Sequence, residues 1–332
     1  MSAPPRRRRA LALPELVDGV CAGDRAVLGR AITLVESELP AHQDLAQELL
    51  TALLPRTGRA ARVGVTGVPG AGKSTFLEAL GVRLADGGQR IAVLAIDPSS
   101  GRSGGSILGD KTRMLRLGAH PGAFIRPSPS AGSLGGVHRK TRETLLLCEA
   151  AGFDVVFVET VGVGQSEVAV AGMVDTFLVL MLAGAGDELQ GIKRGILELA
   201  ELLVVHKADG PQKDAAERAR RQQEGALHYL QPATPGWTTP VLTASSLTGE
   251  GLSEVWEAVR AHRAHLAATG ELERRRLAQA EGWMWGMVQA EVWRRFRAHP
   301  GVAEALPEIE AALRRGELTA VAAAARLLAR GP

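Results

Sequence analysis

The chain has 332 residues, of which 45% are hydrophobic and 23% charged, and it carries a formal net charge of +3. These proportions are ordinary for a globular protein and exclude a disordered chain, and no apolar run approaches the roughly 18 residues of a transmembrane helix. The two cysteines, Cys21 and Cys148, exclude a disulfide framework and a cluster held by cysteine alone, and they are typical of a cytoplasmic protein.

The chain begins with a predicted basic tail, residues 1–10, which contains four consecutive arginines at positions 6–9. Without these arginines the remaining sequence is close to neutral, so we predict binding neither to nucleic acid nor to a membrane. Blocks of like charge are usually solvated, and we expect the same of this tail. A mitochondrial presequence is the alternative, although the stretch is short and has Ser2 as its one hydroxyl residue.

Residues 11–58 are predicted to form an N-terminal helical segment. Hydrophobic residues recur at near-helical spacing after Asp24, which fits the N-cap of the helix that follows it. A second helix is predicted over Ala41–Leu54, and Pro55 and Gly58 end it. No residue here suggests catalysis, so we interpret the segment as a scaffold or a docking surface.

Residues 59–265 alternate short apolar runs with helical segments. Continuous apolar runs are typical of parallel strands that are buried on both faces. Their alternation with helices predicts an α/β fold, a doubly wound and mostly parallel sheet flanked by the N- and C-terminal helical extensions. The predicted strands are Arg62–Thr66, Ile91–Ile96, Val155–Glu159, Thr176–Leu182, Leu202–Val205 and Pro240–Ala244.

The first predicted strand leads into a P-loop motif, G-x-x-x-x-G-K-[ST], and a predicted helix over Thr75–Leu84 follows. Glycines in such a loop let backbone N–H groups converge on phosphate oxygens, and the helix N-terminus adds a positive dipole end. We therefore predict that Lys73 reaches the β- and γ-phosphates of a nucleotide and that the Ser74 hydroxyl ligates Mg²⁺. The predicted binding residues are Gly67, Pro69, Gly70, Ala71, Gly72, Lys73, Ser74 and Thr75.

Three acidic residues are predicted to complete the magnesium site. Asp97 follows the second predicted strand, Asp110 lies in the next loop, and Glu159 ends the third predicted strand. Carboxylates at this edge of a parallel sheet face the ligand crevice, and Mg²⁺ prefers oxygen ligands. Asp97 and Glu159 are also candidate catalytic residues: Glu159 either holds Mg²⁺ through water or orients the attacking water. The alternative for Asp110 is a helix N-cap.

The base is predicted to be guanine. His206-Lys207-Ala208-Asp209 ends a late strand, where P-loop GTPases carry N-K-x-D. The Asp209 carboxylate can accept hydrogen bonds from N1–H and N2–H₂ of guanine together, which adenine does not offer. We expect the Lys207 stem over the base, while His206 supplies one donor and one acceptor where an amide is usual. The loop of Ser245, Ser246 and Leu247 follows the last strand and is predicted to meet guanine O6 through its backbone.

Residues 266–332 are predicted to be helical. The amphipathic stretch Leu272–Ala298 and the residues around it carry three of the five tryptophans of the chain. Pro300-Gly301 and Pro307 are predicted to interrupt the helix, and a last helix is predicted over Thr319–Leu328. So many large aromatic side chains need a surface to pack on, which is either the sheet domain or a second subunit.

The order of these motifs resembles the MeaB/ArgK family of P-loop GTPases, which have a SIMIBI-type G domain and include the human protein behind one form of methylmalonic aciduria. The resemblance implies a Mg²⁺-dependent GTPase that is slow alone and stimulated by its partner. It also implies a homodimeric chaperone that gates cofactor loading of a cobalamin-dependent acyl-CoA mutase, chiefly methylmalonyl-CoA mutase, and protects that mutase. The matching stretches are Ala31–Ser37, Gly67–Thr75, Ala95–Ser100, Ile107–Met114, Glu159–Glu167 and Gly184–Lys193.

By this resemblance Gly184–Lys193 is an extra switch loop that the partner rearranges, and Lys193 is a candidate catalytic residue that stabilises charge on the phosphates. The resemblance also makes the C-terminal helices a dimerisation arm. The sequence departs from the family at three positions: His206 replaces Asn, Ser246 replaces Ala, and Ala183 replaces a common Pro.

Three alternatives remain at the level of sequence. A nickel chaperone GTPase shares this sheet class but usually carries histidine-rich tracts or a cysteine-containing metal site, whereas the eight histidines here are scattered. A small-molecule kinase would need a preference for adenine, against which Asp209 argues. The third alternative is an inactive GTPase that serves as a dimeric scaffold, since His206 departs from the usual Asn. The sequence does not determine which acyl-CoA mutase is the partner.

Overall fold

The computed structural model describes residues 9, 11–96, 114–128, 134–160, 166–184 and 194–331, except the side chains of residues 128, 134–138, 166 and 194. The chain separates into two compact units, Met1–Leu272 and Glu273–Pro332. Within the first unit, the division into residues 11–58 and 59–265 stays a prediction. None of the helices in the described ranges is both long and apolar enough to cross a membrane.

The first unit is built on a seven-stranded sheet in which every pair of neighbours is parallel, in the order β3-β2-β4-β1-β5-β6-β7. Six strands confirm the predicted ones to within one residue at either end. All residues of β2 and β4 are buried, as the apolar runs predicted. The strands are β1 Ala61–Gly67, β2 Ile91–Ile96, β3 Ala123–Ser128, β4 Val155–Thr160, β5 Thr176–Leu182, β6 Leu202–His206 and β7 Val241–Ala244.

The strand β3 was not predicted, and its position in the sheet explains why. It pairs only with β2, at the edge of the sheet, and it contains Arg126 and Pro127. An edge strand tolerates a proline and a charged residue because one side has no ladder to complete. A search for continuous apolar runs, which are typical of buried strands, therefore does not predict β3.

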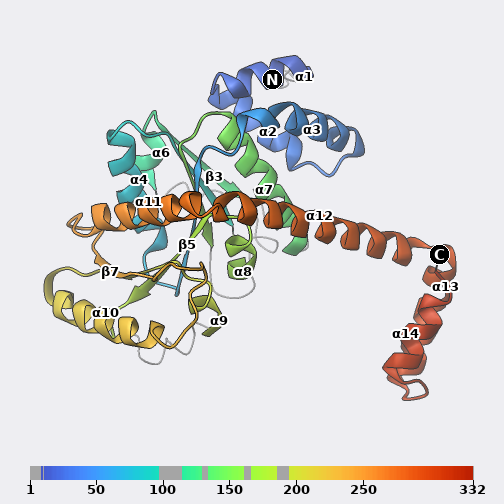
Figure 1. Ribbon diagram of the computed structural model, residues 1–332. Helices are drawn as coiled ribbons and strands as arrows, with labels where there is room; N and C mark the ends of the chain where they lie inside the picture. Colours follow the sequence, from blue (N-terminus) through green and yellow to red (C-terminus); the bar gives the residue numbers. More distant parts are fainter. Residues whose placement is uncertain are drawn as a thin grey trace, which may run out of the picture. The chain divides into compact units, whose positions relative to one another are not determined.

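Helices cover both faces of the sheet, as predicted for a doubly wound fold (Figure 1). On one face α4 packs against β1, β2 and β4 and also contacts α6 and α11; on the other, α7 and α8 contact each other and the strands beneath them. The helix α10 packs on β6 and β7 at one edge. The bounds are α4 Lys73–Asp86, α6 Leu115–Ala119, α7 Leu134–Ala150, α8 Ser166–Ala171, α9 Arg194–Leu197, η3 Gly210–Gln212, α10 Lys213–Leu227 and α11 Leu252–Ala268.

The N-terminal helices pack together on α7 and bury a single apolar cluster with it. They are α1 Leu13–Cys21, α2 Arg25–Val35, α3 Pro40–Leu53 and η1 Leu54–Arg56. The predicted N-cap is confirmed: the Asp24 carboxylate accepts the backbone N–H of Ala26 at 2.7 Å and of Val27 at 3.1 Å. These two bonds satisfy donors that the first turn of α2 leaves without an intrahelical partner.

The second unit consists of α12 (Glu271–Ala298, its first two residues in the first unit), α13 (Pro300–Arg314) and α14 (Ala320–Leu328). The predicted break at Pro300 is confirmed, because α13 begins there with proline in its first turn. The predicted break at Pro307 is wrong: α13 runs through it. A proline inside a helix removes one backbone hydrogen bond, and here the packing of α13 on α14, which buries Val302 and Ala323, outweighs that loss.

Candidate nucleotide-binding site

The site lies where the central strands end. Gly67, the last residue of β1, pairs with Leu180 of β5, and Val65 two residues earlier pairs with Glu159 of β4. The loop after β1 therefore opens between two buried neighbours, at the carboxyl edge where parallel sheets bind ligands. The helix α4 begins at Lys73 and turns its N-terminus toward this loop.

Two glycines of the loop are required by close approach. Gly67 has φ +151°, and a Cβ there would lie 2.2 Å from the Leu180 carbonyl oxygen. Gly72 has φ +84°, in the left-handed region, and a Cβ there would lie 3.0 Å from the His206 ring. Both positions therefore exclude a side chain, Gly67 by contact with the next strand and Gly72 by backbone conformation.

Lys73 is almost buried and lies over the loop. Its Nζ donates to the backbone oxygens of Gly67 at 2.8 Å and Val68 at 3.4 Å. Burial lowers the pKa of this ammonium, and the charges of Glu159 and Glu167 act in the opposite direction. The loop thus holds a cation whose hydrogen-bond partners are weak neutral acceptors that an anion can replace.

Ser74 and Glu159 meet beneath the start of α4. The Ser74 hydroxyl donates to Glu159 Oε1 at 2.7 Å, and the Glu159 carboxylate is only 3% exposed. Beside them the Thr160 hydroxyl donates to the Thr66 hydroxyl at 2.8 Å. Oxygen donors of this kind, a hydroxyl with an adjacent carboxylate, fit Mg²⁺.

The base-recognition residues follow β6 and β7. Lys207 has φ 59°, the one left-handed non-glycine residue in the part of the chain that the structure describes. The Ala208 N–H donates to the Ala244 oxygen at 3.1 Å and so holds this turn against the end of β7. Strained backbone of this kind is found mainly where a function requires it. A cavity of about 240 Å³ opens here, lined by Gly72, Thr75, His206, Lys207, Asp209, Ser246 and Leu247.

His206 joins the P-loop to the base-recognition loop. Its Nδ1 lies 2.6 Å from the Ala71 carbonyl oxygen, and its Nε2 lies 2.6 Å from the Ser246 hydroxyl. A carbonyl can only accept, so Nδ1 carries the proton, and in the neutral ring Nε2 then accepts from Ser246. Burial lowers the pKa of His206, which favours this neutral form. His206 and Ser246, two of the three positions at which the sequence departs from the resembled family, are therefore hydrogen-bonded to each other.

Ser245 holds the other half of the base pocket. Its hydroxyl, in a fully buried residue, donates to Asp209 Oδ2 at 2.5 Å and accepts the N–H groups of Leu247 and Thr248, each at 3.2 Å. This bond fixes the orientation of the Asp209 carboxylate through Oδ2. Leu247 lies at the rim with its side chain 85% exposed, so only its backbone is ordered by the loop.

The structure brings the predicted P-loop residues, Glu159 and the predicted base residues together at one sheet edge. Asp97, Asp110 and Lys193 lie outside the described residues. Sequence reasoning missed two contributors. The Ala71 carbonyl is one, since a backbone acceptor leaves no trace in sequence. Buried Glu167 is the other, and its only signal was an acidic residue soon after Gly162 and Gly164, which follow β4 in the sequence.

The comparison with protein families shows to which family this chain belongs. Residues 28–301 match the family described as methylmalonyl Co-A mutase-associated GTPase MeaB. The chain belongs to the MeaB family. Its members are GTPases, so the nucleotide predicted from the P-loop and from Asp209 agrees with the family's activity, and this chain is a GTPase.

Relatives of this MeaB-family chain match over nearly its whole length. A Caulobacter vibrioides protein that carries a GTPase name is 59% identical over 321 residues, which cover 96% of this chain and 98% of that one. The mitochondrial methylmalonic aciduria type A homolog of Mus musculus is 46% identical over 94% of this chain and 78% of its own. A crystal structure of a protein described as a LAO/AO transport system kinase has a TM-score of 0.78 at 40% identity, covering 96% and 98% of the two chains.

Proposed function

We propose that this GTPase requires Mg²⁺ and works as a homodimeric chaperone of a cobalamin-dependent acyl-CoA mutase. Methylmalonyl-CoA mutase is the first candidate, since the family description names it and the mouse relative is named for methylmalonic aciduria. In this role GTP hydrolysis gates cofactor loading and protects the mutase. The observation that carries the proposal is a continuous series of hydrogen bonds across the nucleotide site. Lys73 and the Ala71 N–H both donate to the Val68 oxygen, and His206 joins the Ala71 oxygen to Ser246.

The phosphates occupy the P-loop. Its backbone N–H groups and the N-terminus of α4 surround the anion, and Lys73 exchanges its bonds to the Gly67 and Val68 oxygens for phosphate oxygens. This exchange is favourable because a charged acceptor forms a stronger bond to an ammonium than a neutral carbonyl does. Pro69, Gly70 and Thr75 are exposed around the same space and complete the cradle.

Ser74, with Glu159 behind it, holds Mg²⁺, which when bound neutralises charge that develops on the phosphates. Because the Glu159 carboxylate accepts directly from the Ser74 hydroxyl, we assign Glu159 to the metal side, where it would help to hold Mg²⁺. Asp97 and Asp110 supply further oxygen ligands in this proposal. A Glu159→Gln variant is expected to need a higher Mg²⁺ concentration for half-maximal hydrolysis while its affinity for GDP changes little.

Guanine is selected by Asp209, which Ser245 keeps oriented, and by the backbone of the loop Ser245–Leu247 at guanine O6. In that loop the Leu247 N–H is engaged by the Ser245 hydroxyl, so we assign O6 recognition to the Ser246 N–H. The Lys207 stem covers the base; it approaches Gly72, whose added Cβ would lie 3.7 Å from Lys207 Cε. Desolvated polar groups of this kind reject adenine because they would lose their partners.

The deciding experiment measures hydrolysis of GTP and of ATP, each alone and with a methylmalonyl-CoA mutase from the same genome. GTP-selective hydrolysis that rises strongly with the mutase is expected. A slow GTP rate that the mutase leaves unchanged would point to another acyl-CoA mutase. Equal rates with GTP and ATP would contradict the assignment of Asp209.

Two lysine variants separate binding from activation. Lys73→Ala is expected to abolish GTP binding, since the cation over the P-loop is lost. Lys193→Ala is expected to bind GTP normally and to lose the stimulation by the mutase, because we assign Lys193 to the activated complex only. Stimulation that survives intact in Lys193→Ala would contradict its role in the switch loop.

The nickel chaperone alternative is tested by titrating the full chain with Ni²⁺. Among the described residues no group of three or more His, Cys, Asp or Glu side chains could hold a metal ion. A tight stoichiometric nickel site would favour that alternative over the mutase chaperone.

A further inference from the structure

A second cavity of the first unit lies at the opposite edge of the sheet from the P-loop. It has a volume of about 880 Å³, and its wall includes Ala61 and Val155, where β1 and β4 begin. These strands run from the cavity to Gly67 and Thr160, so the two sites are separated by about 20 Å of parallel sheet. A cavity of this size is typical of small-molecule sites, and the proposed GTPase mechanism makes no use of it.

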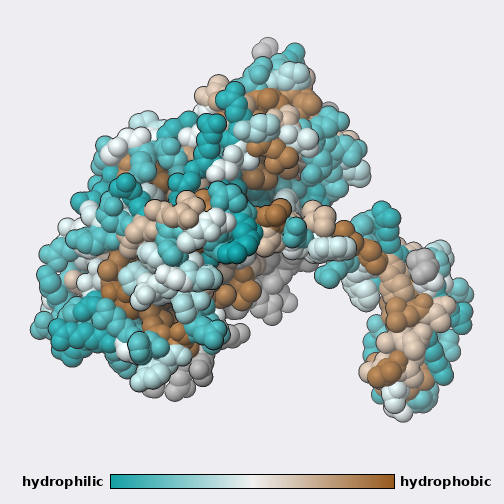
Figure 2. Space-filling view, viewed as in Figure 1, coloured by the Kyte–Doolittle hydropathy of each residue, from teal (hydrophilic) through white to brown (hydrophobic). Residues whose placement is uncertain are grey.

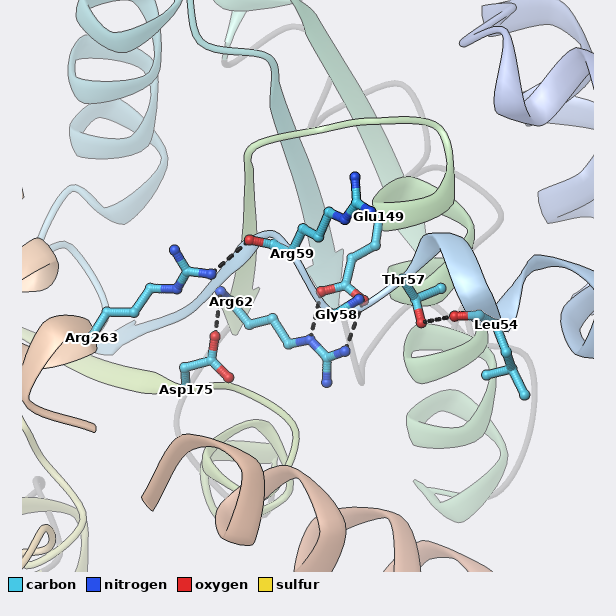
Figure 3. A network of polar contacts seen from close by, with 8 residues as sticks. All are labelled: Leu54, Thr57, Gly58, Arg59, Arg62, Glu149, Asp175 and Arg263. Carbon is cyan, nitrogen blue, oxygen red and sulfur yellow. Dashed lines mark hydrogen bonds and ion pairs between the residues drawn. The ribbon is translucent and has the colours of Figure 1, made fainter. Parts of the chain in front are cut away.

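Four arginines line this cavity from two directions. Arg56 and Arg59 come from the end of the N-terminal helices and the segment before β1, and Arg260 and Arg263 come from α11. One terminal nitrogen of Arg263 donates to the Arg59 backbone oxygen at 2.6 Å, which fixes the two sides relative to each other (Figure 3). The cavity thus has a cationic wall that is held in place.

The carboxylates near this wall already have partners. Glu149 accepts two bonds from Arg62, at 2.9 and 2.8 Å, and a third from the Gly58 N–H at 3.0 Å (Figure 3). Asp154 accepts the Arg90 backbone N–H at 2.7 Å. Glu149 is therefore paired with Arg62, while Asp154 keeps its negative charge. Set against the four arginines that line the cavity, one unpaired carboxylate leaves the wall positively charged.

The arginines, in contrast, have guanidinium N–H groups that form no hydrogen bond with any described residue. Within the described ranges, the guanidinium groups of Arg56 and Arg59 form no hydrogen bond or ion pair, and Arg263 Nε is buried without a partner. Arg260 has one exposed ion pair with Glu257, which contributes little. A buried donor without a partner costs free energy, so an anion that supplies an acceptor to Arg263 Nε is favoured. Arg56 and Arg59 are exposed and contribute positive charge around that nitrogen.

An apolar surface completes the cavity. Phe153, Val155, Trp256 and Val259 line it, and each is at most 9% exposed. Leu272 closes it from the start of α12. Trp256 has the largest exposed fraction of these side chains, 9%. A ligand in the cavity would therefore place a charged group on the arginines and a nonpolar group against Trp256.

We propose that this cavity binds a small organic phosphate, with its phosphate group on Arg56, Arg59 and Arg263 and its nonpolar part against Trp256. The planar forks of arginine match phosphate oxygens in pairs, which a compact ammonium cannot do. The volume of about 880 Å³ matches a small molecule. Because the ligand would bridge the N-terminal helices, the sheet edge and α11, its binding is expected to raise the melting temperature of the protein.

The test is isothermal titration of the full chain with phenyl phosphate as the probe, in saturating GDP and Mg²⁺ so that the P-loop is filled. One molecule is expected to bind per chain, more tightly than inorganic phosphate, which lacks the nonpolar part. Arg59→Gln and Arg56→Gln are each expected to weaken binding about tenfold, by loss of a charge-assisted hydrogen bond. Arg218→Gln is the matched control, because Arg218 is an exposed arginine of α10 outside the cavity.

Arg263→Lys keeps the charge but removes the fork and Nε, and it is expected to weaken binding as well. Its thermal unfolding without ligand shows whether it has folded. No binding in saturating GDP, or an equal loss in Arg59→Gln and Arg218→Gln, would overturn the proposal. Equal affinity for phenyl phosphate and inorganic phosphate would overturn the assignment of the apolar wall. GTP hydrolysis by the Arg59→Gln variant is expected to match the wild type, so failure here leaves the proposed GTPase chemistry untouched.

Discussion

His206 connects both halves of the nucleotide site through one imidazole ring. The ring donates to the P-loop and accepts from Ser246, and the edge of Phe76 packs against it at a centroid distance of 5.7 Å. The charges that act on it are Lys207, which disfavours its protonation, and Asp209, which favours it. Like the amide of an asparagine, the neutral His206 ring can donate one hydrogen bond and accept another. Unlike an amide, it can also be protonated when the pH falls.

This proton-dependent state predicts that affinity for GDP falls in mild acid. Burial lowers the pKa of His206 below 6.5, so the neutral ring and its bond from Ser246 are present above pH 6.5 and are lost as the pH falls through the lowered pKa. Loss of one hydrogen bond of about 1 kcal/mol corresponds to a several-fold weaker affinity. Titrations with fluorescent GDP from pH 7.5 to 5.0 measure this change in affinity. The His206→Asn variant is expected to show a weaker dependence of GDP affinity on pH.

The control for this experiment is His228→Asn, since His228 is exposed on the surface and should leave the pH dependence unchanged. An identical acid-induced loss of affinity in wild type and His206→Asn would show that another group is responsible. Ser246→Ala is expected to weaken GDP binding at pH 7.5 and to reduce the pH dependence of binding. The reason is that His206 Nε2 then accepts no hydrogen bond from residue 246.

At the scale of elements, buried polar contacts determine how the N-terminal helices join the sheet. Glu149 at the end of α7 binds Arg62 of β1 in two bonds and also the Gly58 N–H that precedes β1 (Figure 3). The Glu149 side chain is fully buried and that of Arg62 is 13% exposed. The Asp175 carboxylate accepts the Arg62 backbone N–H at 3.0 Å on the other side. The Glu149 carboxylate thus connects α7, β1 and the segment that precedes β1.

Glu149→Gln is therefore expected to lower the free energy of unfolding by about 3 kcal/mol, because Arg62 would keep a buried charge without a matching carboxylate. Urea unfolding followed by circular dichroism measures this change. The matched control is Glu257→Gln in the exposed Arg260–Glu257 pair, where both side chains are 64% exposed and a change below about 0.5 kcal/mol is expected. Equal effects in the two variants would contradict a special role for the buried pair.

The first turn of α2 offers a second prediction at this scale. The Asp24 carboxylate accepts two backbone N–H groups there, so Asp24→Ala is expected to cost about 1 kcal/mol of unfolding free energy. The same urea experiment measures it, and Asp24→Asn, which keeps an acceptor oxygen, should retain most of the stability. If Asp24→Ala unfolds at the wild-type urea concentration, the cap does not stabilise α2.

At the scale of the whole molecule, the second unit exposes many large apolar side chains. Trp285 is 59% and Trp293 60% exposed, and Figure 2 shows further hydrophobic residues along the same unit. Large apolar side chains that are exposed together usually mark an interface. The other exposed members are Leu277, Met284, Met287, Val288, Val292, Leu313, Val321 and Leu328.

If these residues form the proposed dimer interface, the wild type should be dimeric and a Trp285→Ser/Trp293→Ser double variant should dissociate. Light scattering after size-exclusion chromatography, over a range of protein concentrations, measures the mass. The control is Tyr229→Ser, since Tyr229 is 87% exposed in the first unit and should not affect association. A wild type that is monomeric at tens of micromolar, or a double variant that stays dimeric, would contradict this interface.

The sequence by itself determined six strands, the P-loop and the family, because each depends on local features: continuous apolar runs, glycine spacing and motif order. It also predicted the Asp24 cap, whose acceptor and donors are two and three residues apart. Only the tertiary structure decided the rest. It placed β3 at an edge, carried α13 through Pro307, paired His206 with Ser246, and closed an arginine cavity between residues 56–59 and α11. These features join residues that lie far apart in the chain or depend on packing, so no local pattern encodes them.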